Sequence, residues 1–177
     1  GAFATAYRQS SQTRQQTLGE RRAGGVVPQT RVRDSLFEQD ITGLFAQFSS
    51  NFSLAATDHT LTYGIDVYRT NNENLREGGT TDAATGEPVR EFLPLPTRDF
   101  PVTEVENRAF FLQDEIVMLD GRLRVTPGLR YDDYEADTTV DDLYITGNPG
   151  VAPPSDFADS ALTLKLGGLY RFTDNVS

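Results

Sequence analysis

Alternation of apolar and polar residues with a period of two is the feature that most constrains the fold of this chain. From Arg122 to Tyr134 one set of alternate positions reads Leu, Val, Pro, Leu and Tyr, whereas the intervening positions are mainly Arg, Thr, Gly and Asp. Successive side chains of a β-strand point to opposite faces, so this segment predicts a strand with one apolar and one polar face. Residues 161–172 and 60–70 alternate in the same way.

Two further segments, residues 36–50 and 106–119, have a β-like pattern that is less cleanly sorted, and in the second of them Asp114 shares a face with apolar residues. Residues 2–9 add the end of a further strand, and no long helical pattern is present. We therefore expect an all-β fold, an antiparallel up-and-down meander of about 5–6 long strands. Several of these strands exceed the usual length of roughly 5–6 residues. A tilted strand that crosses a bilayer needs about 9–11.

Composition excludes several functional classes. The 16 basic and 26 acidic residues give a formal net charge of −10, which argues against binding to a nucleic-acid backbone. The absence of Cys and the presence of a single His exclude a disulfide framework and a metal site built from several histidines or thiolates. The acidic run between Asp132 and Asp142 lacks the spacing of a calcium loop. We expect no catalytic, cofactor-binding or metal-binding residue, and thus no enzyme, and we interpret His59 as a surface residue.

The connections between the expected strands differ systematically in length. Short turns are expected at about residues 53–58, 120–121 and 173–177, and Asp120-Gly121 is a typical two-residue hairpin turn. Long polar loops are expected at about residues 10–30, 70–100 and 135–158. Alternate connections of a meander lie at opposite edges of the sheet. All short turns would then share one edge and all long loops the other, which is typical of an outer-membrane barrel.

A soluble β-sandwich is the alternative interpretation of the same alternation. In a sandwich the apolar faces of two sheets meet in a core, and the polar faces contact solvent. The chain would then be a β-rich binding or adhesion module. A sandwich has no reason to separate short turns from long loops, so the connections favour the barrel.

Three sequence stretches carry a resemblance to a known family. They are Phe110-Phe111-Leu112-Gln113-Asp114-Glu115-Ile116, Asp120-Gly121-Arg122-Leu123 and Thr126-Pro127-Gly128-Leu129-Arg130-Tyr131-Asp132. Together they resemble the recurring "QDE" strand, tight turn and "GLRYD" strand of TonB-dependent outer-membrane receptors. Residues 169–177 resemble the strand and turn that follow. Residues 59–66 and Asp99-Phe100-Pro101 are most similar to the haem and haemoglobin receptor branch of that family.

This resemblance implies a 22-stranded barrel in the outer membrane of a Gram-negative cell, plugged by an N-terminal domain. Such receptors take up haem or ferric siderophores with energy passed on by TonB. We expect residues 1–177 to be a curved, open segment of the large transmembrane barrel, without the plug and without the segment that contacts TonB. A siderophore receptor and a passive porin are the related alternatives. The implied partners are the TonB system through the missing N-terminal region, outer-membrane lipid, and haem, a haem protein or an iron chelate at the extracellular face.

Charged residues at the polar positions of the strands are the remaining candidates for a functional role. In a barrel wall they would face the lumen, where ion pairs with the plug are a more natural role than direct contact with the substrate. The predicted lumen-facing residues are Asp66, Arg122, Arg124, Arg130, Asp132, Lys165 and Arg171.

Overall fold

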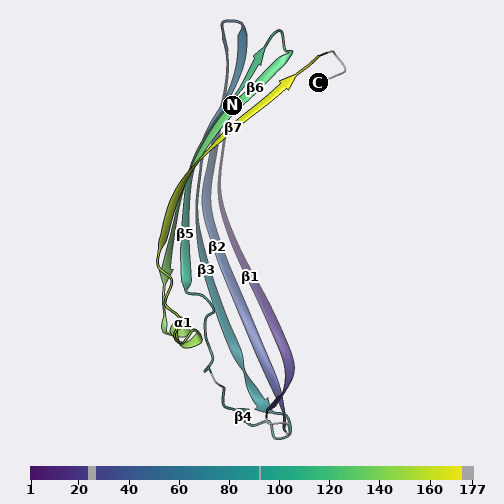
Figure 1. The fold of residues 1–177 in the computed structure, drawn as a ribbon, viewed down its shortest axis with the longest axis vertical. Coiled ribbons are helices and arrows are strands. Elements are labelled where there is room, and N and C mark those ends of the chain that lie inside the picture. The colour runs from purple at the N-terminus through teal and green to yellow at the C-terminus, as the bar shows by residue number, and fades with distance from the viewer. Residues whose placement is uncertain (24–26, 92, 173–177) are drawn as a thin grey trace.

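The chain forms one curved antiparallel sheet, as Figure 1 shows for a computed structural model that describes residues 1–23, 27–91 and 93–172. The six long strands are β1 (Ala2–Ala23), β2 (Val27–Leu54), β3 (Thr57–Asp82), β5 (Val102–Met118), β6 (Leu123–Thr139) and β7 (Phe157–Tyr170). A two-residue strand β4 (Pro88–Val89) and a short helix α1 (Asp142–Gly147) complete the described elements. The long strands are neighbours in chain order, and β4 pairs with β3. The predicted all-β meander of about 5–6 long strands is confirmed.

The strand register collects the apolar residues on one face of the sheet. Residues paired across antiparallel strands project to the same side. One such row crosses all six long strands and consists of Ala4, Ala46, Ile65, Phe110, Tyr131 and Leu162. We call the side of the sheet that carries this row the apolar face, and the opposite side the polar face.

The apolar face has no second layer against it. Ile65, Phe110 and Leu164 are 41 %, 44 % and 74 % exposed, respectively. Among the described residues the buried hydrophobic side chains are those of Ala109 and Tyr144. A contiguous apolar surface of this kind requires an apolar neighbour. The described residues thus lack the inter-sheet core of a soluble sandwich, whereas a barrel wall bordered by lipid accounts for the exposed face.

All three expected long loops are shorter than their polar sequences suggest. In place of a loop over residues 10–30, β1 continues to Ala23 and β2 begins at Val27. In place of loops over 70–100 and 135–158, β3 runs to Asp82, β6 runs to Thr139, and β7 begins at Phe157 with α1 between the last two.

The strands extend into the segments expected to be loops for one physical reason. Where both faces of a strand contact water, apolar alternation is absent although the backbone ladder continues. Cross-strand polar contacts are formed along the extensions instead, for example Gln12 Nε2 to Glu38 Oε1 at 2.5 Å and Arg14 Nη2 to Asp34 Oδ2 at 2.9 Å.

The turns and the loops lie at opposite ends of the sheet. At one end, β2 ends at Leu54 and β3 begins at Thr57, and a turn over residues 119–122 joins β5 to β6. The latter turn is longer than the two residues expected, with positive φ angles at Leu119, Asp120 and Gly121. The loops over residues 83–101 and 140–156 lie at the other end, where β1 to β3 extend furthest (Figure 1). We call these the short-turn end and the long-loop end. The turn expected at 173–177 lies outside the described residues.

Aromatic rings occupy the polar face between the two ends. The rings of Phe45 and Phe111 stack at 5.8 Å, and Phe3 lies 6.2 Å from Phe45. The Phe111 ring covers Gly64, where a Cβ would lie 2.6 Å from Cζ of Phe111 and would overlap the carbonyl oxygen of Ala46. Only a residue without a side chain fits beneath this ring.

Arginine substitutions on the two faces test which of them borders lipid. Leu164→Arg places a charge on the apolar face, so we expect it to destabilise the full-length protein in lipid vesicles by about 2–4 kcal/mol. Ala161→Arg lies on the polar face of the same strand opposite Asp132, so its effect should stay within about 0.5 kcal/mol. Urea unfolding followed by circular dichroism measures both. Equal costs for the two variants would contradict the assignment of faces.

The contact between Gly64 and Phe111 predicts that adding one methyl group at position 64 lowers the stability of the protein. Gly64→Ala forces the Phe111 ring and the neighbouring strand apart, which should cost about 1–3 kcal/mol in the same unfolding experiment. Gly168→Ala is the matched control, because nothing lies within 4 Å of a Cβ there. A Gly64→Ala protein as stable as the control would show that the ring can move aside freely.

Candidate functional site

The predicted lumen-facing charges are distributed along the sheet and do not form one cluster. Five of them lie within strands on the polar face, namely Asp66, Arg124, Arg130, Asp132 and Lys165. Arg122 lies in the turn over residues 119–122, and Arg171 follows β7, where its N–H donates to the carbonyl of Arg122 at 2.8 Å. These two residues therefore belong to the short-turn end instead of the strand interior.

The five strand charges are already engaged by neighbouring side chains. Arg130 pairs with Asp132 at 2.8 Å and with Asp66 at 3.5 Å. Arg124 lies 3.4 Å from Glu115, and Lys165 Nζ donates to Gln113 Oε1 at 3.3 Å. The Arg130–Asp132 pair lies within β6, and the other contacts join different strands and stabilise the register of the sheet. These contacts leave no convergent binding site among the five residues.

His59 accounts for the acidic residue that interrupts the apolar face. Its Nδ1 lies 2.7 Å from Oδ2 of Asp114, and its Nε2 lies 2.9 Å from the hydroxyl of Thr57. The imidazole also stacks on Phe52, with the ring centroids 4.8 Å apart. His59 is thus half-buried and fully engaged, in contrast to the free surface residue expected from the sequence. The pair gives Oδ2 of Asp114 a partner among apolar side chains, whereas its buried Oδ1 has none among the described residues.

The described residues offer neither a metal cluster nor a membrane-spanning helix. No group of three or more His, Asp or Glu side chains in residues 1–23, 27–91 and 93–172 is arranged to hold a metal ion. In the same residues no helix has the length and hydropathy needed to cross a membrane.

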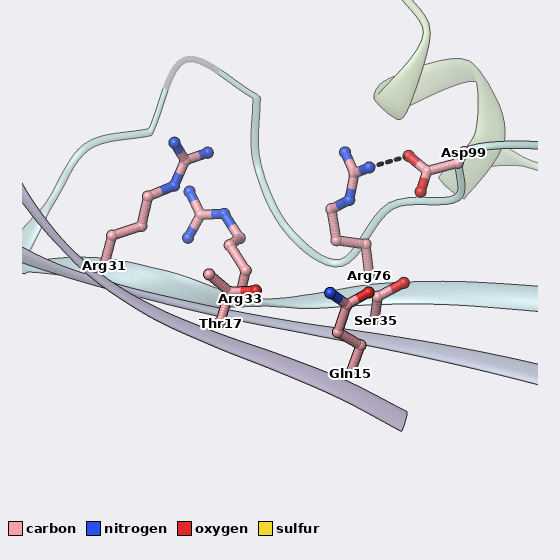
Figure 2. Close-up of a pocket in the computed structure, with 8 residues that line it drawn as sticks. Gln15, Thr17, Arg31, Arg33, Ser35, Arg76 and Asp99 are labelled. Atoms are coloured by element: carbon pink, nitrogen blue, oxygen red, sulfur yellow. Dashed lines mark ion pairs between the residues drawn. The ribbon is translucent and has the colours of Figure 1, made fainter. Parts of the chain in front are cut away.

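A basic pocket at the long-loop end is the site that the sequence did not reveal. It lies on the polar face, has a volume of about 560 Å³, and is lined by Arg31, Arg33, Arg76 and Asp99 together with Gln15, Thr17, Gly19 and Ser35 (Figure 2). Arg31, Arg33 and Ser35 are alternate residues of β2 and so project to one side. Ser35 is paired with Arg76 of β3, which makes Arg33 and Arg76 diagonal neighbours. The strand register therefore places all three arginines on one face of the sheet, where they line the same pocket.

Two carboxylates from the loop over residues 83–101 contact these arginines. Glu91 Oε1 lies 2.8 Å from Nη2 of Arg33, and Asp99 pairs with Arg76, as the dashed line in Figure 2 shows. Within the described part of the chain Arg31 forms no ion pair. Three cations thus meet two anions, a local excess of positive charge in a chain whose net charge is −10.

Glu91 is held as a carboxylate by the groups around it. The hydroxyl of Thr80 donates to Glu91 and is the largest cause that lowers the pKa of the carboxyl below its ordinary value. Partial burial opposes this shift, and the positive charges of Arg33 and Arg31 reinforce it. Glu91 is therefore anionic at neutral pH and contributes one of the two negative charges at the pocket.

Arg98 fastens the loop that carries these carboxylates. Its side chain is nearly buried, with 8 % of the residue exposed, and it donates at 2.7 Å each to Asp141, to Glu73 and to the carbonyl of Asn74. Burial by itself would lower the pKa of Arg98, but the contacts with Asp141 and Glu73 outweigh it and raise the pKa. Arg98 therefore links the loop to β3 and to the start of α1.

Backbone contacts hold the adjoining residues of the loop in place. Arg76 and Thr97 exchange backbone hydrogen bonds of 2.8 and 2.9 Å, and the N–H of Asp99 donates to Oδ1 of Asn74 at 2.7 Å. The side chain of Asn148, just after α1, donates to the carbonyl of Arg98 at 2.9 Å. The backbone on either side of Arg98 is thereby fixed, and Asp99 is positioned beside Arg76.

The pocket is suited to binding anions. A guanidinium group presents several fixed N–H donors and forms short, strong contacts with carboxylate and similar oxygen anions. The hydroxyl and amide groups of Thr17, Ser35 and Gln15 add neutral donors and acceptors. Arg31 and Arg33 could have been noticed as alternate residues, but the expected bounds placed Arg76 in a loop, away from them.

The fold is a single antiparallel sheet with an exposed apolar face and a polar opposite face. This arrangement is typical of a segment of the wall of a transmembrane β-barrel. The particular family follows from a comparison with family models. The model described as "TonB dependent receptor-like, beta-barrel" matches residues 2–177, so the chain belongs to this family. The family is one of receptors and not of enzymes. A search among curated proteins finds no match.

Solved structures share the fold of this chain. The ferric preacinetobactin receptor BauA from Acinetobacter baumannii is 16 % identical, with a TM-score of 0.66 over 98 % of this chain and 26 % of the receptor. The ferric citrate transporter FecA in its unliganded form is 19 % identical, with a TM-score of 0.56 over 97 % of this chain and 23 % of the transporter. The chain thus spans about a quarter of the length of these structures.

Removing the Arg98 side chain should loosen the loop that lines the pocket. Arg98→Ala deletes three contacts and leaves Glu73 and Asp141 without their shared cation, so the amides of Thr97 and Asn148 should exchange with solvent at least about tenfold faster. Hydrogen exchange of the full-length protein, read by mass spectrometry, measures this effect. Arg90→Ala is the control, because Arg90 is exposed and pairs with no described carboxylate. Unchanged exchange in Arg98→Ala would show that the loop is held by other contacts.

Proposed function

We propose that this chain is part of the wall of a TonB-dependent receptor in the outer membrane, and that the receptor takes up an iron chelate with acidic groups. The observation that carries the chemistry of the ligand is the pocket of Arg31, Arg33 and Arg76. In a barrel the apolar face contacts lipid and the polar face borders the lumen. The long-loop end is then extracellular and the short-turn end periplasmic, which puts the pocket at the outer opening.

The two similar structures support an iron chelate as the ligand class. One is a ferric preacinetobactin receptor and the other a ferric citrate transporter. At less than 20 % identity they support the fold of this chain directly and the ligand class only as an analogy. In this proposal a plug and a TonB-contacting segment belong to other parts of the receptor. The five charged strand residues Asp66, Arg124, Arg130, Asp132 and Lys165 border the plug.

Haem and ferric siderophores present related chemistry to the pocket. Haem carries two propionate groups, and many ferric chelates carry free carboxylates or other anionic oxygens, all of which suit guanidinium groups. The resemblance of residues 59–66 to haem receptors supports haem, and the similar structures support a ferric siderophore or ferric citrate. Binding measurements with each of these ligands distinguish the two branches.

Replacement of the pocket arginines tests the proposal. In the full-length receptor Arg31→Ala, Arg33→Ala and Arg76→Ala should each weaken binding of the anionic iron complex by about 10- to 100-fold, because each removes a charge-assisted contact. Haem, ferric citrate and a neutral ferric trihydroxamate are the three probes, measured by fluorescence quenching or calorimetry. Arg90→Ala removes the same charge from the same end of the sheet and should have little effect.

Uptake in cells tests the transport part of the proposal. Iron delivered by the preferred probe should accumulate only in cells with a working TonB system, and the arginine variants should reduce it in proportion to their binding defect. Uptake that persists without TonB would favour the passive porin. Failure of every anionic iron complex to bind, or binding that ignores all three arginines, would refute the proposed role of the pocket.

A further inference from the structure

Two of the three pocket arginines are already occupied by acidic groups of the protein itself. Arg33 contacts Glu91, and Arg76 contacts Asp99, whereas Arg31 lacks such a partner within the described part of the chain. Both carboxylates belong to the same connection between β4 and β5. An anion that enters the pocket must therefore compete with them for the guanidinium groups.

We infer that Glu91 and Asp99 occupy the positions of the ligand's acidic groups, and that the pocket consequently selects chelates with at least two such groups. The inference deepens the proposed function, on which it rests. It adds a requirement on the ligand: one acidic group replaces Glu91 on Arg33, a second replaces Asp99 on Arg76, and a further group can bind Arg31.

The affinity of a ligand depends on its number of acidic groups because these groups compete with Glu91 and Asp99, which are tethered beside the arginines. A side chain held beside its partner acts like a competitor at an effective concentration on the order of millimolar. A monoanion therefore gains little by exchanging with Glu91 or Asp99. A ligand with two or three acidic groups can bind Arg31 first, after which each further exchange is also intramolecular. Neutral chelates leave both protein pairs intact and gain no contact with these arginines.

The surroundings of Glu91 define what a replacing group has to offer. Glu91 accepts a hydrogen bond from the hydroxyl of Thr80 as well as the contact from Arg33. Thr80 is buried, so its hydroxyl would lose its partner if Glu91 left without a replacement. Both contacts are made by Oε1 of Glu91, so one acidic oxygen of a ligand at this position can serve Arg33 and Thr80 together.

The surroundings of Asp99 allow its exchange without unfolding of the loop. Its backbone is fixed by the hydrogen bond to Asn74 and by the neighbouring Arg98 and Thr97 contacts. Its side chain is 40 % exposed, so the carboxylate can rotate from Arg76 into solvent and remain hydrated. The exchange thus requires a change of side-chain rotamer at Asp99 and no rearrangement of the sheet.

Calorimetry on the full-length receptor with citrate and acetate as probes tests the inference. In the unmodified receptor citrate, with three carboxylates, should bind at least 100-fold more tightly than acetate, with one. The double variant Glu91→Gln/Asp99→Asn removes both competitors, so citrate should bind about tenfold more tightly and acetate should gain by a larger factor, which narrows the preference for citrate. Each single variant should produce a smaller change in the same direction and serves if the double variant does not fold.

Glu87→Gln is the matched control. It removes the same charge from the same loop over residues 83–101, but Glu87 is exposed and forms no ion pair with the described residues. If Glu87→Gln gained as much citrate affinity as the double variant, the gain would be explained by the loss of negative charge alone, and the inference would be overturned.

The remaining outcomes separate this inference from the proposed function. Unchanged or weaker citrate binding in the double variant, or acetate bound as tightly as citrate by the unmodified receptor, overturns the role of Glu91 and Asp99 while the arginine pocket stands. Citrate bound only by the double variant supports the inference directly. Failure of both proteins to bind citrate, or binding that Arg31→Ala does not weaken, overturns the pocket as an anion site and with it the proposed function.

Discussion

The hydrogen-bond ladder between neighbouring strands is the constraint on which the rest of this structure depends. In hydrocarbon no water can satisfy a backbone N–H or C=O, so every such group within the membrane must find a partner in the next strand. The described residues have almost no apolar core that could hold the sheet by packing. Register is therefore decisive, since a slip of one residue would turn an entire strand's apolar side chains to the other face. The row from Ala4 to Leu162 shows one register kept across all six long strands.

The same ladder explains how a sheet with one apolar face also carries the basic pocket. Beyond the apolar rows β1, β2 and β3 continue as polar strands, and their pairing extends to Ala23, Val27 and Asp82. Rigid strands position side chains more accurately than free loops do. Arg31, Arg33 and Arg76 are held by this extension, and the loop fastened through Arg98 then supplies Glu91 and Asp99. The pocket is thus a consequence of strand length and register first and of loop conformation second.

The sequence predicted those parts of the fold in which the two faces of a strand contact different media. Residues 122–134 alternate between an apolar and a polar face of the sheet, and β6 was predicted from this alternation. Residues 10–20 are exposed on both faces, show no alternation, and were mistaken for part of a loop. Asp114 was noticed as an exception on an apolar face, but its partner His59 comes from another strand and could not be inferred. The basic pocket was missed for the same reason, because pairing of Ser35 with Arg76 is a property of register.

Net charge and local charge act in opposite directions at the pocket. A chain with a formal charge of −10 repels anions at a distance, although salt confines this repulsion to about 8 Å at physiological ionic strength. Long-range steering therefore contributes little to capture of an anion by these residues. Recognition has to come from short contacts with Arg31, Arg33 and Arg76, two of which are balanced by carboxylates of the protein. Such a site gains specificity at some loss of affinity, because an anion is retained only if it replaces the protein's own contacts with better ones.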